Sequence, residues 1–592
     1  MVDVTGYVRE AMKSLAGLVE PFAEIVFVSA TPYWGGGYTG RTFRCASRDC
    51  SSYEFLWQGA DQIRGMLRWL ARAAVASYID DEALDEEGYR GVEDYPARGT
   101  ETGLLKRLFG STAGKRAQAA AFALEAWLES DPQPFAEYKD VLGLLQAVKR
   151  AGPKALQILE QEAYSRLRSG KCKRDDFICL FAVPRFYLLA LGAKINPESP
   201  ESLANAARSL FELQPARPGT LVFRLRLRER PGAALRPEER FLLASLALAE
   251  PVLLGLGKSV SRGFGRFLPR KDSYSFNTGN PAYDEKLGTL AEILATKPDR
   301  SAIEQLMDTV LDAAARALGV DHEPYRGLTA VPRLSYARAN MRYVEQLKHP
   351  CMLATREYVP KPNDPQGQRL VADYCSPAKR RLVASVLEAL SAVGKAATKA
   401  VWKIYYYSYL SPGKRLPSRL AVKKPGVGFH TWVLGLPRQQ QGRGYALGAI
   451  RVSVSECTRP GRLDEGRRLS SVVVSVLPLG QGYTAVILPL AAAYDVPAKL
   501  LHGVRLLHVG EHGQKPGRRG VIVVTDVVAA AAHKHKRITP KGNDPRCRSW
   551  TKPMDAGVVK PGMHERAQSH DGKHCAEKAL GAALDWLETL LK

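Results

Sequence analysis

The stretch LLGLGKSVSRGFGRF spans residues 253–267 and carries the most informative pattern in the chain. Four glycines in it are interleaved with three cations, namely Gly255, Gly257, Gly263 and Gly265 with Lys258, Arg262 and Arg266. Glycine lets a backbone approach a ligand closely, and neighbouring cations contact anionic groups. The pattern is typical of a loop that binds a phosphodiester chain, although a glycine-rich hairpin with solvated charges has the same composition.

Other phosphate-binding loops do not match this spacing. A Walker loop that ends at Lys258 requires glycine at position 252, where the chain has Val252. A dinucleotide-binding loop that starts at Gly255 requires glycine at position 260, where the chain has Val260. We therefore expect no nucleotide cofactor, and no other cofactor is indicated.

Strand and helix patterns precede this loop. Residues 23–30 are rich in β-branched side chains and predict a strand, as do residues 220–230, in which apolar side chains alternate with arginines. Such alternation places the arginines on one sheet face, where they either extend a basic surface or cover the sheet with their stems and pair with acids on a neighbouring strand. Residues 59–79 and 237–249 have the apolar spacing of helices.

Further elements are expected along the rest of the chain. The alanine- and leucine-rich residues 115–170 predict a helical insertion, and residues 177–192 predict a strand. Two helical patterns divided by a Lys-Pro pair cover 272–320, and another covers 376–404. The C-terminal third predicts a second strand-containing unit, followed by a basic tail and a last helix near 575–591.

Arg64, Arg68 and Arg72 stand four residues apart on the helix expected over 59–79 and form one stripe. The stripe would extend a basic surface beside the glycine-rich loop. A solvated helix face explains it equally well, because arginine is a good helix former.

Tyr33, Trp34 and Tyr38 lie among glycines in the stretch TPYWGGGYTG. Aromatic rings in such a loop are suited to stack on unpaired bases. Packing in a hydrophobic core is an equally good interpretation.

Six motifs, taken in order, resemble the RAMP superfamily of CRISPR proteins, and within it the first subunit of the type III-B (Cmr) effector complex. They are TPYWGGG at 31–37, DQIRGMLRWLAR at 61–72, LLKRLFGS at 104–111, SRGFGRF at 261–267, VLGLPR at 433–438 and GRRLSS at 466–471. Each motif is short, and their joint order is more specific than any one of them. The resemblance covers about residues 20–500 and leaves the tail unassigned.

The resemblance implies an α+β fold with two ferredoxin-like domains of the β-α-β-β-α-β type. Accordingly, residues 1–272 are expected to form the first domain, which contains the helical insertion near 115–170. Residues 273–400 would form a helical connector, and residues 401–592 a second ferredoxin-like domain with a basic tail.

The resemblance also implies a non-catalytic subunit that holds guide RNA, target RNA or both near one end of the complex, beside other RAMP subunits. Arg64 and Arg68 and the glycines and cations of residues 255–266 are the expected RNA contacts. Arg467 and Arg468 are a second candidate contact, with a solvated basic loop as the alternative.

A RAMP endoribonuclease is the alternative function. A histidine acting as general acid or base would be expected in the first domain, yet the first histidine of the chain is His322. That mechanism is therefore excluded there, whereas lysine- or tyrosine-assisted cleavage is not. The histidines and cysteines of the tail match no zinc spacing, so we expect no metal site and no catalytic residue.

The net charge and the cysteine content of the chain agree with an intracellular RNA-binding protein. Lysine and arginine number 85 against 60 acids, a net charge of +25, which favours a polyanionic partner. Nine scattered cysteines and the absence of an apolar leader predict reduced thiols in a cytoplasmic protein without a membrane span.

Overall fold

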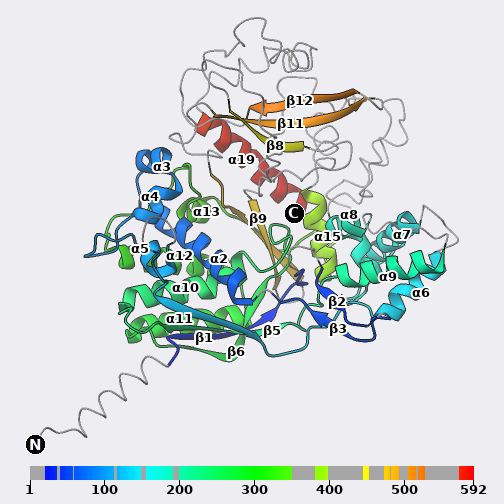
Figure 1. Cartoon of the computed structure of the whole chain (residues 1–592), viewed down its shortest axis with the longest axis horizontal. Coiled ribbons are helices and arrows are strands. Elements are labelled where there is room, and N and C mark those ends of the chain that lie inside the picture. Colours follow the sequence, from blue (N-terminus) through cyan, green and yellow to red (C-terminus); the bar gives the residue numbers. More distant parts are fainter. Residues whose placement is uncertain are drawn as a thin grey trace, which may run out of the picture.

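The fold combines α-helices with antiparallel sheets, as shown in the computed structural model of Figure 1. The structure describes residues 20–35, 41–47, 49–57, 59–111, 117–148, 155–190, 199–349, 381–397, 445–451, 472–479, 482–492, 504–514, 518–526 and 572–592.

The first sheet has the strand order β4-β5-β1-β6. Its strands are β4 (Phe122–Leu128), β5 (Val222–Glu229), β1 (Ala23–Ser29) and β6 (Phe267–Phe276). Neighbouring strands are antiparallel throughout this sheet. Along the chain, helix α2 (Gly59–Ala76) lies between β1 and β4, and helix α10 (Pro237–Leu253) lies between β5 and β6.

The alternation in β5 decides which face of the sheet is buried. Phe223, Leu225 and Leu227 are buried, and Phe223 pairs with Phe27 of β1 across the strands. The arginines between them point to the opposite face. The predicted strands over 23–30 and 220–230 and the helices over 59–79 and 237–249 are confirmed.

Two further helices of the N-terminal part lie next to α10. They are α11 (Pro281–Thr296) and α12 (Arg300–Leu318), with Asn280 and Asp299 as their N-caps. The predicted pair of helices over 272–320 is therefore confirmed. Short helices α3 (Asp81–Glu87), α4 (Tyr89–Asp94), α5 (Leu104–Phe109) and α13 (Leu334–Asn340) and the hairpin of β2 (Phe43–Cys45) and β3 (Tyr53–Phe55) complete this part.

A second core is shared by β9 (Val472–Leu479), β10 (Gly482–Pro489), α15 (Val386–Ala396), α19 (Gly572–Leu591) and a group of helices from the N-terminal half. The N-terminal helices of this core are α6 (Tyr138–Val148), α7 (Ala155–Arg168), the 3-10 helix η2 (Ile178–Ala182), α8 (Pro184–Ala190) and α9 (Pro200–Leu213).

Two predictions for this region are wrong. The expected strand over 177–192 is helical: the segment is apolar on all sides, so periodicity does not separate strand from helix, and Pro184 suits a first helical turn. Within the expected helical insertion 115–170, residues 122–128 instead form β4, because they pair with β5.

The second sheet has the order β7-β10-β9, with β7 (Arg342–Val344), β10 (Gly482–Pro489) and β9 (Val472–Leu479). Helices α15 (Val386–Ala396) and α19 (Gly572–Leu591) pack against it. The predicted connector over 273–400 therefore needs correction, because β7 and α15 belong to the second sheet unit. The pairing of Tyr343 with Val486 is long-range and leaves no local signal in the sequence.

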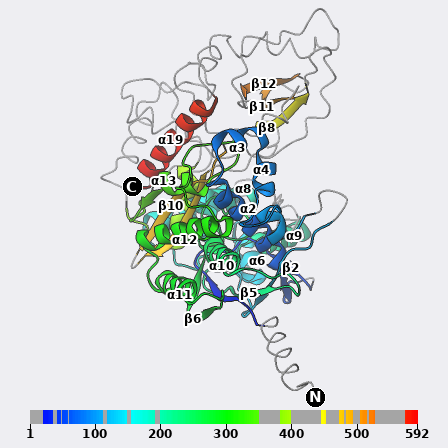
Figure 2. The same ribbon diagram turned by 90° about the vertical axis from the view of Figure 1, so that its left-hand side faces the viewer.

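A third sheet has the order β12-β11-β8, with β12 (Arg518–Asp526), β11 (Val504–Gln514) and β8 (Tyr445–Arg451). It lies at the end of the molecule opposite β1 and β6 (Figure 1), and Figure 2 shows it at the same end in a second view. The strands and the last helix expected in the C-terminal third are confirmed where they are described. Residues 401–444 and the basic tail over 533–571 lie outside the described residues.

Two disulfides correct the prediction of reduced cysteines. Cys45 pairs with Cys50, and Cys172 pairs with Cys179. Spacing alone did not reveal these pairs, because each depends on a local turn that brings two Cβ atoms together. Within the described part of the chain, no helix is long and apolar enough to span a bilayer.

Candidate nucleic-acid interface

The glycine-arginine loop, residues 254–266, connects α10 to β6 and folds tightly onto the protein itself. Leu256 N donates to Gly265 O at 2.8 Å, which closes the loop. Lys258 N donates to Trp34 O at 2.6 Å, so the loop also lies against residues 31–35. On its other side it contacts β9, where Val474 N donates to Ser261 O at 3.4 Å.

The four glycines of the loop have positive φ, with Gly255 at 75°, Gly257 at 92°, Gly263 at 88° and Gly265 at 65°. A Cβ atom on Gly265 would collide with the carbonyl oxygen of Leu256. One on Gly263 would collide with Val476 of β9. These glycines permit a close approach, as expected, but the approaching groups are the protein's own backbone and β9 instead of a phosphate.

Arg266 has no exposed surface, so it does not contact a phosphate as predicted. Its guanidinium donates to Ser475 Oγ at 2.8 Å and to the carbonyl oxygens of Leu254, Phe264, Val260 and Val474. Burial lowers the pKa of Arg266 to about 9, and Glu250 opposes that shift. Arginine remains charged even so, and here it joins the first sheet unit to β9.

Glu250 on α10 is the buried acid near this cation. Its side chain is fully buried, and neither carboxylate oxygen has a hydrogen-bond partner within the described part of the chain. Burial raises the pKa of Glu250 well above its usual value, although the charge of Arg266 opposes the shift. An acid in this environment favours its neutral form.

Arg262 and Lys258 are the partly exposed cations of the loop. Arg262 forms a parallel bridge with Val474, and its Nη1 donates to Ser261 O at 3.0 Å. Burial, and next the positive charge of Arg185, lower the pKa of Arg262 to about 10. Two like charges are therefore held close together here.

Arg185 was missed by sequence reasoning. It lies exposed in the first turn of α8, and its Nε donates to Ser259 Oγ at 3.3 Å. The wrong strand prediction for 177–192 gave no reason to place it beside the loop. Arg185, Lys258 and Arg262 together form the basic cluster, the name used below for these three residues.

The arginine stripe on α2 is engaged in the fold. Arg64 Nη2 donates to Phe109 O at 3.2 Å. Arg68 and Arg72 both bind Glu93, with Nη2 to carboxylate distances of 2.7 and 2.6 Å. Burial tends to raise the pKa of Glu93, but hydrogen bonds from these two arginines hold it below the usual value. The stripe therefore fixes α2 against α4 and α5.

The aromatic side chains expected to stack on bases are core residues. Tyr33 and Trp34 have no exposed surface. Tyr33 lies 5.6 Å from Phe55 and Trp34 lies 5.2 Å from Phe264, measured between ring centroids. The stacking prediction for these two rings is corrected, because a buried ring presents no face to a base. Tyr38, Arg467 and Arg468 lie outside the described residues.

The open face of the first sheet carries a balanced set of charges. Arginines 224, 226 and 228 of β5 form ion pairs with glutamates 24, 125 and 129. Arg226 also lies over the ring of Trp127, with its Cζ 4.9 Å from the centroid. Three cations are matched by three acids, so this face is not a basic platform. Of the two interpretations that the alternation left open, these contacts agree with pairing to acids on neighbouring strands.

The histidine, cysteine and acidic side chains of the described residues were compared with the arrangement that a metal ion requires. No group of three histidine, cysteine or acidic side chains is arranged there to hold a metal ion. His349 is buried, and its Nε2 lies 3.3 Å from Glu388 Oε2. Arg381 Nη2 lies 2.7 Å from Oε1 of the same glutamate. Among the tail histidines, His533, His535, His564 and His570 lie outside the described part, and His574 lies in α19.

Comparisons with known proteins show what the chain is similar to. Residues 31–267 match the sequence model of the RAMP superfamily. Among solved structures, the chain is similar to Cmr1 from Pyrococcus furiosus in its apo form, with a TM-score of 0.36, 12% identity, and coverage of 80% of this chain and 89% of that one. It is also similar to a chain in the type III-B Cmr-beta complex bound to cognate target RNA, with a TM-score of 0.35, 12% identity, and coverage of 80% and 94%.

No curated protein matches the chain. The superfamily match ends at Phe267, directly after the glycine-arginine loop, and begins at Thr31, in the segment on which that loop packs. The family comparison therefore shows a RAMP-superfamily match over residues 31–267 of this chain.

Proposed function

We propose that this protein is a non-catalytic RNA-binding subunit of a type III-B CRISPR effector complex. In this role it holds guide RNA, target RNA or both near one end of the complex, beside other RAMP subunits, in the cytoplasm. The observation that carries the proposal is the RAMP-superfamily match over residues 31–267, which contains the whole glycine-arginine loop. The order of the remaining motifs supports the more specific assignment.

The connectivity supports two ferredoxin-like units. The order β1-α2-β4-β5-α10-β6 along the chain, with the sheet order β4-β5-β1-β6, is the arrangement expected of a β-α-β-β-α-β unit. In the second unit, β7, α15, β9, β10 and α19 occur in this order along the chain, with β8 inserted before β9 and β11 and β12 inserted before α19, and the sheet order is β7-β10-β9. These elements correspond to the first five of a β-α-β-β-α-β unit, that is, to β-α-β-β-α.

The basic cluster is our proposed RNA contact. Arg185 is exposed, Lys258 and Arg262 are partly exposed, and the three side chains come from two segments brought together by the fold. The net charge of +25 gives the surface the sign that an RNA backbone requires. Contacts of this kind read the backbone, so sequence would be read by pairing between guide and target.

RNA binding by the purified full chain tests the proposal. We expect it to bind labelled single-stranded RNA with an affinity that falls steeply with salt. The Arg185→Ala, Lys258→Ala double variant should weaken binding by about 10-fold or more and lower the slope of log affinity against log salt by about 1.4. Lys271→Ala with Arg300→Ala removes the same net charge from exposed positions on β6 and α12 and is the control.

The same samples test the absence of catalysis. We expect labelled RNA to remain intact over hours, with or without divalent metal. Cleavage that co-purifies with the chain and is lost in a point variant would instead support the endoribonuclease alternative. A wild-type chain that does not bind RNA at low salt would contradict the proposal itself.

A further inference from the structure

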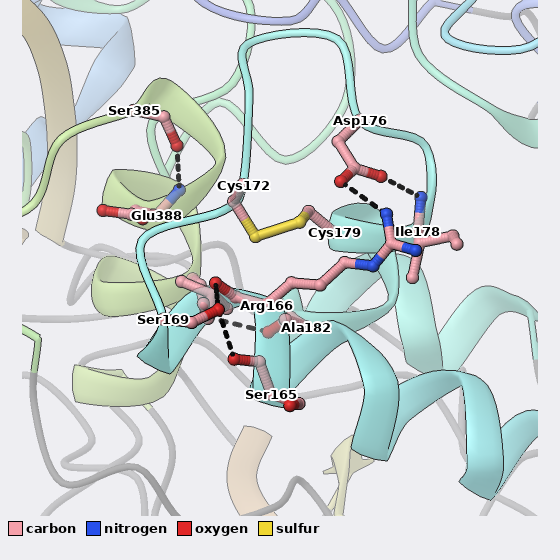
Figure 3. The surroundings of a disulfide bond; sticks show 12 residues. Ser165, Arg166, Ser169, Cys172, Asp176, Ile178, Cys179, Ala182, Ser385 and Glu388 are labelled. Atoms are coloured by element: carbon pink, nitrogen blue, oxygen red, sulfur yellow. Dashed lines mark hydrogen bonds and ion pairs between the residues drawn. A yellow bond between two sulfur atoms is a disulfide. The ribbon is translucent and has the colours of Figure 1, made fainter.

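Residues 171–179, here called the disulfide loop, form an exposed turn between α7 and η2 whose shape is fixed at several points (Figure 3). The bond between Cys172 and Cys179 closes the turn, and both cysteines are buried. Inside the turn, Ile178 N donates to Asp176 Oδ1 at 3.0 Å. A loop held in this way loses little conformational freedom when its exposed side chains bind a partner.

Both acids of the disulfide loop form ion pairs with arginines from outside the loop. Asp176 Oδ2 lies 3.0 Å from Arg166 Nη1, a pair drawn in Figure 3. Asp175 Oδ2 lies 3.6 Å from Arg217 Nη1. These two pairs anchor the loop to α7 and to the turn before β5.

The cations of the disulfide loop face solvent. Lys171, Lys173 and Arg174 are exposed, and within the described part of the chain none of them forms an ion pair. The guanidinium of Arg174 lies against Gly219, where a Cβ atom would collide with it. The anchoring arginines therefore neutralise the acids, while three cations stay available to an anion.

The disulfide loop and the glycine-arginine loop contact the same small region of the protein. Arg174 and Asp175 reach the turn at 216–219, whose Ala216 bridges to Tyr33. Lys258 N binds Trp34 O, the next residue along. A second connection runs from Phe177 of the disulfide loop to Phe186, the residue after Arg185, whose ring centroids lie 6.1 Å apart.

We propose that the disulfide loop is a second phosphate-binding element, which continues the path of an RNA backbone from the basic cluster to Lys173 and Arg174. The inference rests on the proposed RNA-binding function and adds to it a site at which no RNA contact was expected. Cations that bind phosphates position a nucleic acid without selecting its sequence. The ligand is therefore the phosphodiester backbone of single-stranded RNA, independent of base composition.

Filter binding of a labelled single-stranded RNA to the full chain tests this element, with Lys173→Ala and Arg174→Ala combined. We expect affinity to fall by about 10-fold and the slope of log affinity against log salt to fall by about 1.4. The Lys271→Ala, Arg300→Ala control removes the same net charge and should change affinity by less than about 3-fold. Equal losses in the two variants would overturn the proposal.

A second variant separates the fixed shape of the loop from its charge. Cys172→Ser with Cys179→Ser keeps every cation, so we expect weaker binding with an unchanged salt slope. An affinity equal to wild type would show that the closed shape does not matter and would overturn that part of the proposal. If circular dichroism shows the cysteine variant to be unfolded, the Lys173→Ala, Arg174→Ala variant alone tests whether the loop binds RNA.

Failure of this inference differs from failure of the proposed function. If the wild-type chain does not bind RNA, the proposed function is wrong. If it binds RNA and only the basic-cluster variant weakens binding, the disulfide loop is not an RNA element. If the loop variant instead loses a co-purifying protein subunit while keeping its RNA affinity, the loop contacts protein and the RNA proposal is overturned.

Discussion

Arg266 shows why residue type and spacing did not identify the ligand of the glycine-arginine loop. Glycine and arginine in alternation suit a phosphate backbone, but they suit a tightly folded loop with many inward-facing carbonyl groups equally well. Arg266 donates to four such carbonyls and to Ser475. A buried charge is tolerated when its donors are satisfied in this way. The sequence pattern drew attention to the loop as a candidate site. Only the fold shows that Arg266 is buried while Lys258 and Arg262 are partly exposed.

Glu250 gives a test at the same scale that depends on pH. Its pKa is raised in the folded state above the usual value of 4.5, so the neutral acid stabilises the fold. That contribution is fully present below about pH 4.5 and is lost as pH rises through the folded-state pKa. Glu250→Gln does not ionise, so its stability relative to wild type should increase with pH by up to about 1.4 kcal/mol per pH unit in that window.

Thermal or denaturant unfolding from about pH 5 to about pH 8 measures this difference. Glu285→Gln, at an exposed position on α11, is the matched control and should show no comparable trend. A constant difference between Glu250→Gln and wild type across the range would mean that Glu250 does not change its protonation state there.

Elements were predictable where a local pattern was strong. The alternation of β5 gave both its position and its buried face, and the Lys297–Pro298 pair gave the break between α11 and α12. Prediction failed where a partner far along the chain decides the structure. β4 is a strand because β5 pairs with it, and β7 is a strand because β10 does.

The glycine-arginine loop also makes a prediction at the scale of an element. Gly265→Ala places a Cβ against Leu256 O and requires a positive φ of 65° for alanine. Gly99 has a φ of 68° and open space around its Cβ position, so Gly99→Ala isolates the backbone cost, about 1–2 kcal/mol. We expect Gly265→Ala to lower the free energy of unfolding by at least about 3 kcal/mol.

Chemical denaturation of the two glycine variants checks this difference. Because β9 docks on the loop, Gly265→Ala should also separate the unfolding of the two sheet units, which would appear as a second transition. Equal destabilisation by the two substitutions would mean that the loop has room to adjust and that it is not a rigid joint.

At the scale of the whole molecule, the superfamily segment and the second sheet unit are joined through buried contacts. Arg266 and Ser475 connect the loop to β9, and Ser475 Oγ donates to Leu253 O. The basic cluster and the disulfide loop border the same region of the superfamily segment. RNA bound there would contact a surface whose shape depends on both units being folded, a dependence that sequence alone did not reveal.

Isolation of the full chain from its native host, followed by sequencing of the bound RNA and identification of the bound proteins, tests the central claim most directly. We predict that small guide RNAs and other RAMP proteins co-purify with the wild-type chain. We further predict that the Arg185→Ala, Lys258→Ala variant retains less RNA than the Lys271→Ala, Arg300→Ala control. Recovery of a chain that carries neither guide RNA nor RAMP partners would contradict the account.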